Sequence, residues 1–416
     1  MAGGPHGLQS RRDPGDGSGG CGARPSTPSA PRPATAAMPW RLARAMAAAA
    51  TPLDVLDLPV EDAGGAVLAG PVRARADLPA FDAAAMDGYA VAGPGPWRPA
   101  GRVLAGRTAP GAVGAGEAVE IGTGAPVPYG TRAVVPYEAV TCADGRLHGP
   151  FVAGRHIRRR GEDCRADTKV VPAGSVVTPV VQGLAASVGH DLLRVRRRPR
   201  VAVLVTGDEL TFSGLPGVGR VRDAIGPMLP GLIDWVGGRA APPVRVADER
   251  ASLATAIADA GEADVVVVCG SSSRGAADHL RAVLRASEAE FLVEGVACRP
   301  GHPQLLARLA DGRPVVGLPG NPYAALVAAL TLLAPLLGAL TGRLAAGGGW
   351  VRLDSRVTAH PVDTRVVAVR REGAKVVPVG RDRPGLLWGA ALADALAVVP
   401  PGWRGEEVEL LALPSR

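Results

Sequence analysis

The stretch RVAVLVTGDEL at residues 200–210 joins an apolar run to a polar turn, and the rest of the chain can be organised around it. Its first half is rich in valine and lies between Pro199 and Gly207, which is typical of a strand covered on both faces. In open α/β sheets the carboxyl ends of such strands form the ligand crevice. We therefore expect the TGDE turn at a binding site, where its carboxylates could hold a hard cation. A strand that ends in a plain acidic helix cap fits the turn equally well.

Downstream of this stretch, β-prone runs alternate with helix-like runs. Strands are expected at residues 201–205, 244–246, 264–268, 291–296 and 315–318, and helices at residues 228–236, 251–260, 277–286 and 322–340. This alternation predicts a mostly parallel sheet with helices on both faces, a three-layer domain over residues 199–344.

The other segments have different compositions. Residues 1–37 are rich in Gly, Pro, Ser and Arg, which predicts a disordered extension. Residues 81–149 hold short β-prone runs between Gly and Pro turns, and they predict a small β lid inserted between residues 38–80 and 150–198. After a Gly-rich break, residues 350–416 alternate as short strands. The expected fold class is therefore multidomain α/β plus β, with an inserted β lid domain and a C-terminal β domain.

Charge and cysteine content favour a protein of the reduced cytoplasm. The formal net charge is +7, but no basic helix or aromatic-interleaved basic patch accompanies it, so we expect no nucleic-acid partner. The five cysteines are odd in number and show no CxxC spacing, which favours a reduced, cytoplasmic setting. Residues 322–340 carry no charge and meet the length rule for a membrane span, yet they follow strand and turn signals and contain Thr331 and Pro335. A buried core helix is the preferred interpretation, without a membrane partner.

Three loops of the α/β segment are candidates for one crevice: TGDEL at 206–210, CGSSSRGAADH at 269–279 and GLPGNP at 317–322. In the last, Asn321 is placed as N-cap and Pro322 at the first helical position. That arrangement would point unpaired N–H groups at an anion. It could equally be a tight turn between a strand and a helix.

Five motifs occur together: PAFDAAAMDGYAV at 79–91, TGAPVP at 123–128, HIRRRGED at 156–163, TGDEL and GLPGNP. In this order they resemble the molybdopterin molybdenumtransferase family, MoeA and the E-domain of gephyrin, over roughly residues 40–410. The resemblance implies a cytoplasmic homodimer that inserts molybdate into adenylylated molybdopterin and releases AMP, with Mg²⁺ as the cation. It also implies that residues 38–80 and 150–198 form a linking and dimerisation domain, and that a molybdopterin adenylyltransferase is a pathway partner.

The resemblance also assigns roles to individual residues. The catalytic positions that it implies are Asp87, Thr123, Glu209 and Asp278. The substrate and nucleotide positions are Arg158, Asp163, Thr206, Gly207, Asp208, Gly270, Ser271, Pro319, Gly320, Asn321 and Pro322. The molybdate positions are Arg299, His302, Arg365 and Arg370, and the metal positions are Asp208, Glu209 and Asp278. Arg158 and Asp163 could instead be a structural surface ion pair.

Several positions depart from the family pattern at the oxyanion side. The Gly-Gly-Val-Ser loop of the family is GSSS at 270–273, and its Lys-Pro-Gly-Lys-Pro motif is RPGHP at 299–303. Arginine can still hold an oxyanion by two hydrogen bonds, whereas a histidine that is neutral near pH 7 is a weaker anion ligand. A non-catalytic binding or scaffold paralogue is therefore the alternative function. A nucleotidyltransferase acting on molybdopterin itself is a third hypothesis, and the lid and the C-terminal domain argue against it.

Overall fold

The structure is a computed structural model that describes residues 1, 3, 37–106, 111–270, 279–344, 349–354, 357–381, 383–405 and 407–414. The chain divides into two compact units, Met1–Ala36 and Ala37–Arg416. The expected extension at residues 1–37 and the candidate residues Ser271 and Asp278 lie largely or wholly outside the described residues.

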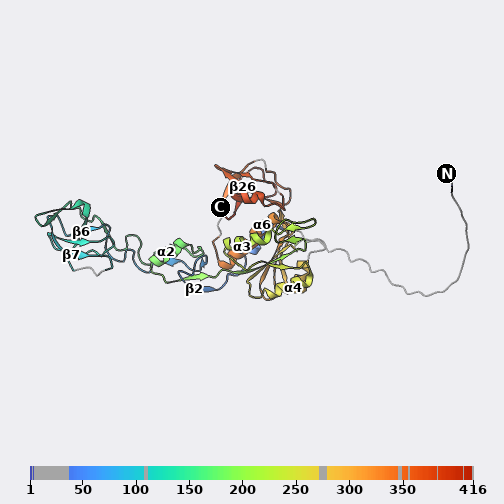
Figure 1. Ribbon diagram of the computed structural model, residues 1–416, viewed down its shortest axis with the longest axis horizontal. Helices are drawn as coiled ribbons and strands as arrows, with labels where there is room; N and C mark the ends of the chain where they lie inside the picture. The colour runs from blue at the N-terminus through green and yellow to red at the C-terminus, as the bar shows by residue number, and fades with distance from the viewer. Residues whose placement is uncertain are drawn as a thin grey trace. The chain divides into compact units, whose positions relative to one another are not determined.

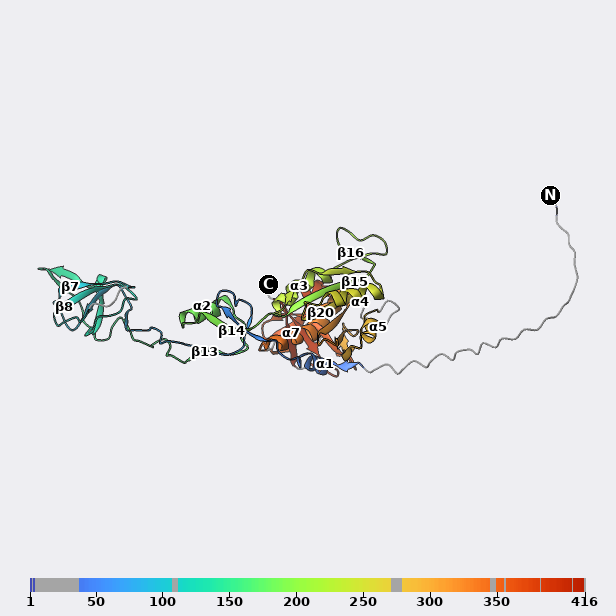
Figure 2. The same cartoon turned by 90° about the horizontal axis from the view of Figure 1, so that it is seen from below.

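The stretch at residues 200–210 begins with an inner strand of a mixed sheet (Figure 2). Its strands are β18 (Arg239–Ala240), β15 (Arg200–Thr206), β20 (Val265–Gly270), β24 (Pro314–Pro319), β23 (Leu305–Arg308) and β21 (Glu290–Glu294), in that order, with β19 (Val244–Val246) also on β15. β15, β20 and β24 run parallel, while β23 pairs antiparallel with β24 and with β21. The antiparallel edge was not predicted. The strand expected at residues 291–296 is confirmed as β21 up to Glu294, but its end is wrong: the chain turns at Gly295, which has φ +89°, and β22 (Val296–Arg299) joins a different sheet.

Helices pack on both faces of this sheet (Figures 1 and 2). Val203 and Val267 lie in one core with α3 (Ile225–Trp235), whereas Leu204 and Val266 lie in the other core with α4 (Arg250–Asp259) and α5 (His279–Ala286). Successive residues of a strand point to opposite faces, so an all-valine strand serves two cores at once. The apolar runs without alternation are explained by this double burial.

The longest apolar segment is a core helix. It consists of α6 (Pro322–Ala328), a π-helical turn (Ala329–Leu333) and α7 (Ala334–Thr341). The segment Pro322–Thr341 is long and apolar enough to cross a membrane, but 78% of its most apolar window is buried inside the fold. The prediction of a buried helix is confirmed.

Helix α1 (Trp40–Ala47) packs on this core helix. Trp40 Nε1 donates to Thr331 Oγ1 at 3.1 Å, and Arg44 Nη1 donates to the Leu330 carbonyl. These bonds engage the π-helical turn, where carbonyls are released from the regular helical pattern. Strand β1 (Met38–Pro39) pairs with β22. The start of the segment 38–80 therefore packs with the core of the α/β domain.

Two further parts of the chain, a linking part and a lid, lie between α1 and the central sheet in sequence. The linking part contains β2 (Val55–Pro59), β14 (Leu192–Arg196) and β3 (Val67–Leu68) in one sheet, covered by α2 (Pro179–Ser187), with β4 (Val72–Arg73) paired to β13 (Lys169–Val171). The lid is a sheet of β7 (Arg98–Val103), β8 (Glu117–Ile121), β6 (Gly88–Val91) and β9 (Ala133–Pro136), with a hairpin of β10 (Thr141–Ala143) and β11 (Arg146–His148). β5 (Ala83–Ala84) pairs with β12 (Ile157–Arg158) where the chain enters and leaves it.

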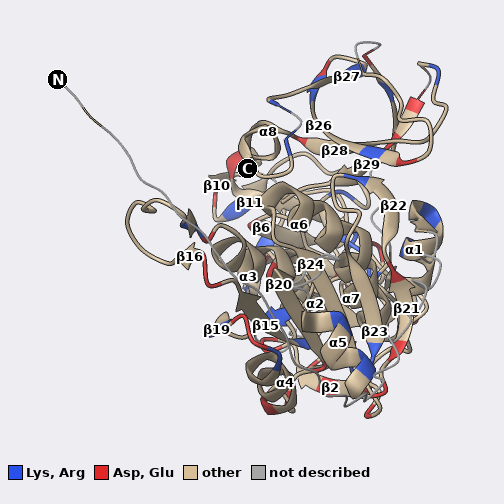
Figure 3. Ribbon diagram, turned by 90° about the vertical axis from the view of Figure 1, so that its right-hand side faces the viewer, with Lys and Arg blue, Asp and Glu red and all other residues tan. Residues whose placement is uncertain are grey.

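The C-terminal strands close into a barrel. β26 (Thr364–Glu372), β27 (Lys375–Pro378), β25 (Trp350–Leu353), β29 (Glu407–Ala412) and β28 (Ala395–Val399) follow one another, and β28 pairs back to β26 (Figure 3). Closure leaves no free strand edge within the ring. β22 also pairs with β26, so the barrel is joined to the α/β domain through backbone hydrogen bonds. The short helix α8 (Trp388–Leu392) packs on β26.

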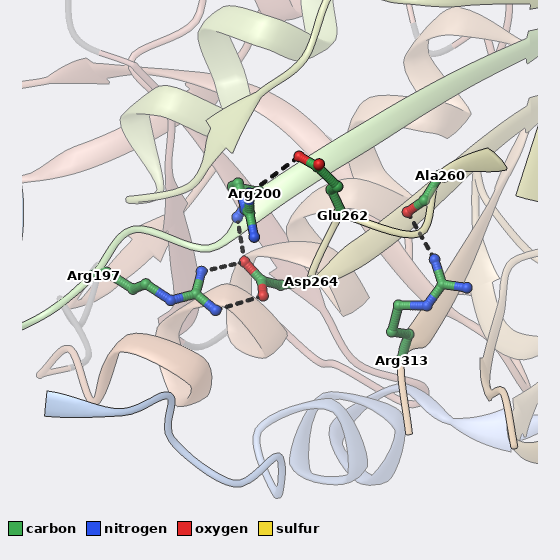
Figure 4. A network of polar contacts seen from close by, with 6 residues as sticks. All are labelled: Arg197, Arg200, Ala260, Glu262, Asp264 and Arg313. Atoms are coloured by element: carbon green, nitrogen blue, oxygen red, sulfur yellow. Dashed lines mark hydrogen bonds and ion pairs between the residues drawn. The ribbon is translucent and has the colours of Figure 1, made fainter. Parts of the chain in front are cut away.

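A partly buried ion pair fixes the joint where the chain passes from β14 into β15 (Figure 4). Arg197 donates through Nη1 and Nη2 to the two oxygens of Asp264, at 2.5 and 2.7 Å, and the Arg200 N–H donates to the same carboxylate at 2.7 Å. Burial opposes ionisation of Asp264, but the hydrogen bonds from Arg197 and Arg200 outweigh burial and hold its pKa below the ordinary value.

Asp264→Asn should lower the free energy of unfolding by about 1–3 kcal/mol at pH 7, because it removes the charge that Arg197 faces. The pKa of Asp264 is lower in the folded protein than in the unfolded chain, where it is about 3.9. The ionised carboxylate therefore contributes its full stabilisation above the unfolded-state pKa, and this stabilisation is lost as the pH falls through the folded-state pKa. The thermal unfolding midpoints of parent and variant should therefore differ at pH 7 and converge only as the pH falls below the folded-state pKa of Asp264. Asp259→Asn, at an exposed position on α4, is the control. Equal midpoints at pH 7 would contradict the role of this pair.

Candidate functional site

The carboxyl ends of three parallel strands lie side by side at one edge of the central sheet. Val205 of β15 is in register with Cys269 of β20, which is in register with Leu318 of β24. The next pair along is Gly270 and Pro319. The described parts of the TGDEL, CGSSS and GLPGNP loops therefore start from adjacent positions, as a crevice at a strand edge requires.

Gly270 has no room for a side chain. A Cβ there would lie 2.5 Å from the Thr206 carbonyl oxygen and 2.8 Å from Thr206 Oγ1, and its φ is +111°. Thr206 is buried, and its hydroxyl donates to the Cys269 carbonyl at 3.0 Å, so this side chain ties β15 to β20. A Cβ on Gly320 would lie 3.6 Å from the Gly270 Cα. At Gly270 and Gly320 the backbones of the loops meet without side chains between them. Peptide groups therefore form the surface at this edge of the sheet.

The TGDE turn carries two exposed carboxylates. Gly207 has φ +136°, and the Glu209 carboxylate lies over it, since a Cβ on Gly207 would be 2.8 Å from Glu209 Oε2. Asp208 Oδ1 accepts a hydrogen bond from the Asp248 N–H at 3.3 Å. Strands β16 (Leu210–Thr211) and β17 (Val221–Arg222) bring Arg220 back to the turn, where its Nη1 donates to the Asp208 carbonyl.

Sequence reasoning missed Asp223 as a site residue. This carboxylate is buried and accepts at Oδ1 from the N–H groups of Ile225 and Gly226, both at 3.0 Å, so it caps the start of α3. Burial raises the pKa of the Cys269 thiol, and the Asp223 charge adds to this effect. Asp223 therefore places a negative charge close to the end of β20. An aspartate just before a helix is a capping signal, but the sequence predicted this helix only from residue 228, whereas α3 starts at Ile225, so the signal was missed.

The start of α6 is not an open anion site. The N–H groups of Tyr323 and Ala324 both donate to the Pro384 carbonyl, at 2.9 and 3.3 Å. Asn321 occupies the N-cap position, but its side chain makes no capping hydrogen bond. A Cβ on Gly385 would lie 3.7 Å from Asn321 Oδ1. The prediction that these helical N–H groups point at an anion is wrong, because a loop of the C-terminal domain already occupies them.

In the lid, the structure brings Asp87 and Thr123 together. The Thr123 N–H donates to Asp87 Oδ1 at 2.7 Å, and both residues are exposed. The Asp87 carbonyl accepts from the Tyr137 N–H in the short helix η1 (Tyr137–Ala139). Tyr137 in turn donates to Glu120, and burial together with that bond raises the Tyr137 pKa to about 12. The described hydrogen bonds of this pair all stay within the lid.

Arg158 and Asp163 form an ion pair with each other. Around them, two aspartates clamp the same loop: Asp82 accepts from the Arg160 N–H and from Arg159, and Asp77 accepts from the Ala166 N–H and from Arg160. Backbone hydrogen bonds are the largest cause that lowers the pKa of both aspartates. These contacts fit the structural interpretation of the RRRGED motif.

The candidate molybdate residues are only partly brought together. Arg299 of β22 is in register with Arg365 of β26. Arg299 Nε donates to Asp363 Oδ2 at 2.7 Å, and Arg365 Nη1 donates to the Thr358 carbonyl. Arg370 lies about 16 Å further along β26, at roughly 3.3 Å per residue. It pairs with Glu372 at 3.1 Å, so it does not share a site with the other two arginines.

The RPGHP loop is held from inside by a residue that the sequence did not single out. Gln304 is fully buried, and its Nε2 donates to the Gly301 carbonyl at 2.8 Å and to Cys298 Sγ at 3.2 Å. The His302 side chain is exposed, while its carbonyl accepts from the Val296 N–H. A Cβ on Gly301 would lie 3.3 Å from the Ala324 carbonyl, so the loop rests on α6.

A cation at the TGDE turn would have two protein carboxylates available. Within the part of the chain that the structure describes, there is no group of three or more His, Cys, Asp or Glu side chains that could hold a metal ion. Asp208 and Glu209 are exposed and adjacent, and Asp278 lies outside the described residues. Magnesium is commonly held by one or two carboxylates, with waters and phosphate oxygens as the remaining ligands. Two carboxylates are enough for a magnesium ion whose other ligands are waters and phosphate oxygens, but they are too few for a metal site made of protein ligands alone.

Comparison with known proteins gives a consistent family. Residues 38–189 match a model described as MoeA N-terminal region (domain I and II), residues 202–339 match a probable molybdopterin binding domain, and residues 351–413 match the MoeA C-terminal region (domain IV). Molybdopterin molybdenumtransferase 2 of Mycobacterium tuberculosis (strain H37Rv) is 37% identical over 307 residues, which cover 68% of this chain and 74% of the relative. Molybdopterin molybdenumtransferase of Staphylococcus aureus (strain N315) is 28% identical over 360 residues, 82% of this chain and 85% of the relative.

A solved structure is similar over most of the chain. The molybdopterin biosynthesis MoeA protein from Pyrococcus horikoshii superposes with a TM-score of 0.75 at 28% identity, covering 91% of this chain and 100% of that chain. The multidomain α/β plus β architecture is therefore that of a known protein.

Gly270→Ala should destabilise the protein by about 2–4 kcal/mol, because the new methyl group overlaps the Thr206 carbonyl and the backbone is strained for any L side chain. The measurement is the thermal unfolding midpoint. Gly183→Ala is the matched control, since a Cβ at this position in α2 meets open space. That control should be neutral or stabilising by about 0.5–1 kcal/mol. An unchanged midpoint for Gly270→Ala would show that the loops are less tightly packed than the structure indicates.

Proposed function

Because the chain belongs to the MoeA family of molybdopterin molybdenumtransferases, we propose that it inserts molybdate into adenylylated molybdopterin and releases AMP. The observation that carries this proposal is the carboxyl edge of β15, β20 and β24, where three glycine-containing loops meet beside an acidic turn. A diphosphate-linked nucleotide can approach such a backbone closely. Mixing the purified protein with adenylylated molybdopterin, magnesium and molybdate, and following AMP release, tests it directly.

At this edge the residues of the chain bind and orient the phosphate groups. Gly207, Gly270 and Gly320 allow close approach of the backbone, and Arg220 is held at the turn by its bond to the Asp208 carbonyl. Asp208 and Glu209 would hold a Mg²⁺ ion that, when bound, offsets the negative charge of the phosphates. The carboxylates alone would repel the same phosphates, so AMP release should depend on the divalent cation.

The oxyanion substrate is assigned to the junction between β22 and β26. Arg299 and Arg365 lie in register there, and the exposed His302 follows in the same loop. Molybdate is a dianion, and arginine can donate two parallel hydrogen bonds to an oxyanion. Arg370 is excluded from this assignment by its pairing with Glu372 further along the strand.

The alternative, a binding or scaffold paralogue, also has a specific observation in its favour. The helix α6 N–H groups are occupied by Pro384, and Arg299 is already paired with Asp363, so part of the expected anion site is satisfied by the protein itself. AMP release that depends on molybdate would separate the two functions. A protein that binds the adenylylated substrate without turnover would be the scaffold.

Glu209→Ala should abolish cation-dependent AMP release, because it removes one of the two carboxylates of the turn. It should leave the unfolding midpoint nearly unchanged, since the side chain is exposed. The control is Glu262→Ala, which removes an exposed carboxylate before β20, at the opposite end of the strands. Full activity of Glu209→Ala would remove this residue from the mechanism.

We also propose a cytoplasmic homodimer in which Asp87 and Thr123 of one subunit complete the edge of the other, with a molybdopterin adenylyltransferase supplying the substrate. The confinement of the described Asp87 and Thr123 hydrogen bonds to the lid supports this, because it leaves their outer surface for a partner. Solution scattering at micromolar concentration should give the mass of two chains. A monomer mass under those conditions would count against the shared site.

A further inference from the structure

One carboxylate that no motif contains lies beside the proposed molybdate residues. Asp363 precedes β26, and its Oδ2 accepts a hydrogen bond from Arg299 Nε at 2.7 Å. The Asp363 side chain is 14% exposed, whereas the Arg299 side chain is 64% exposed. The bond therefore joins a nearly buried anion to an arginine that reaches into solvent.

Asp363 is fixed independently of Arg299. Its N–H donates to His360 Nδ1 at 2.8 Å, and the Val362 N–H approaches the same nitrogen at 3.3 Å. The following residue, Thr364, starts β26 in register with Cys298 of β22. Burial raises the pKa of the Cys298 thiol to about 12, and the Asp363 charge is the next largest cause. Asp363 is thus anchored by its own turn and lies against the buried end of β22.

The geometry of the guanidinium decides what this bond does. Arginine presents its donors on a planar group, and the Nη1–Nη2 edge can hold a second anion while Nε is engaged elsewhere. Among the described residues, Nη1 and Nη2 of Arg299 have no hydrogen-bond partner. The bond to Asp363 uses one edge of the guanidinium and leaves the two-nitrogen edge for a ligand.

We infer that Asp363 is a positioning residue for the oxyanion substrate: it holds Arg299 by Nε so that the Nη1–Nη2 edge is presented to molybdate beside Arg365. This inference rests on the proposed function. An unrestrained arginine would lose side-chain entropy when the dianion binds, and a carboxylate that fixes it beforehand reduces that loss. Asp363 also repels a dianion, but Arg299 lies between the two anions and its charge offsets the repulsion.

The test measures molybdate binding to the full chain by equilibrium dialysis, with AMP release followed on the same preparations. Asp363→Ala should raise the Kd for molybdate about tenfold, since Arg299 is no longer held. Asp363→Asn keeps an oxygen that can accept from Nε, so its Kd should stay much closer to the parent value. Glu372→Ala is the matched control, because it removes a carboxylate from Arg370 on the same strand and should leave the Kd unchanged.

A double variant separates positioning from a general structural role. If Asp363 acts through Arg299, Asp363→Ala should add little to the loss caused by Arg299→Ala. Arg299→Lys keeps the charge at an exposed position, but it lacks a planar group with two edges, so it should also weaken binding. The Kd of Arg299→Lys can be measured even if Asp363→Ala folds poorly.

Three results would overturn the inference. The first is tighter molybdate binding by Asp363→Ala, which would mean that repulsion between Asp363 and the dianion dominates. The second is a double variant in which the losses of affinity of the two single variants multiply, and the third is a parent protein that binds no molybdate. Asp363-dependent binding without AMP release would support the inference and contradict the proposed function. The two proposals can therefore fail separately.

Discussion

The close approach of three backbone segments at the end of β15, β20 and β24 is the constraint on which the site depends. Thr206 ties the first strand to the second through its hydroxyl, and Gly270 leaves no space for a Cβ between them. Gly320 of the third loop lies against the same point. Because parallel strands end at one edge, a glycine at each of these positions converts the edge into a surface of peptide groups. The carboxylates of the TGDE turn, Asp208 and Glu209, are placed by this packing, since they lie within three residues of Thr206.

Two of the contacts that attach the C-terminal barrel to the α/β domain involve groups that could otherwise bind a ligand, or residues beside such groups. The Pro384 carbonyl accepts the first N–H groups of α6, and the β22–β26 pairing brings Arg299 beside Arg365. At the start of α6, the N–H groups that could bind an anion are therefore used to attach the barrel. A helix start that is satisfied by the protein offers less to an anion. The positive charge needed at the oxyanion side must then come from side chains.

Local signals in the sequence were sufficient for the central strands, the core helix and the acidic turn. β15, β20 and β24 are short valine-rich runs bounded by Gly or Pro, and the Asn-Pro pair marks the start of α6. Contacts between distant segments left no such signal. The split of residues 290–299 between two sheets depends on a single glycine, and Pro384 and Asp363 lie some sixty residues beyond the groups that they engage. Their partners are set by the docking of the barrel, which no local pattern specifies.

The pairing of Arg299 with Asp363 also explains how two arginines can lie in register on neighbouring strands. Like charges directly opposite each other in a sheet are destabilising. With Asp363 on Arg299 and the Thr358 carbonyl on Arg365, each guanidinium has an acceptor of its own chain, so the cluster is tolerated before any substrate arrives. A dianion entering between the two arginines then adds to an arrangement that is already electrostatically balanced. Recognition therefore requires no large movement of charge, because the carboxylate that stabilises the empty cluster also holds the arginine in position for the ligand.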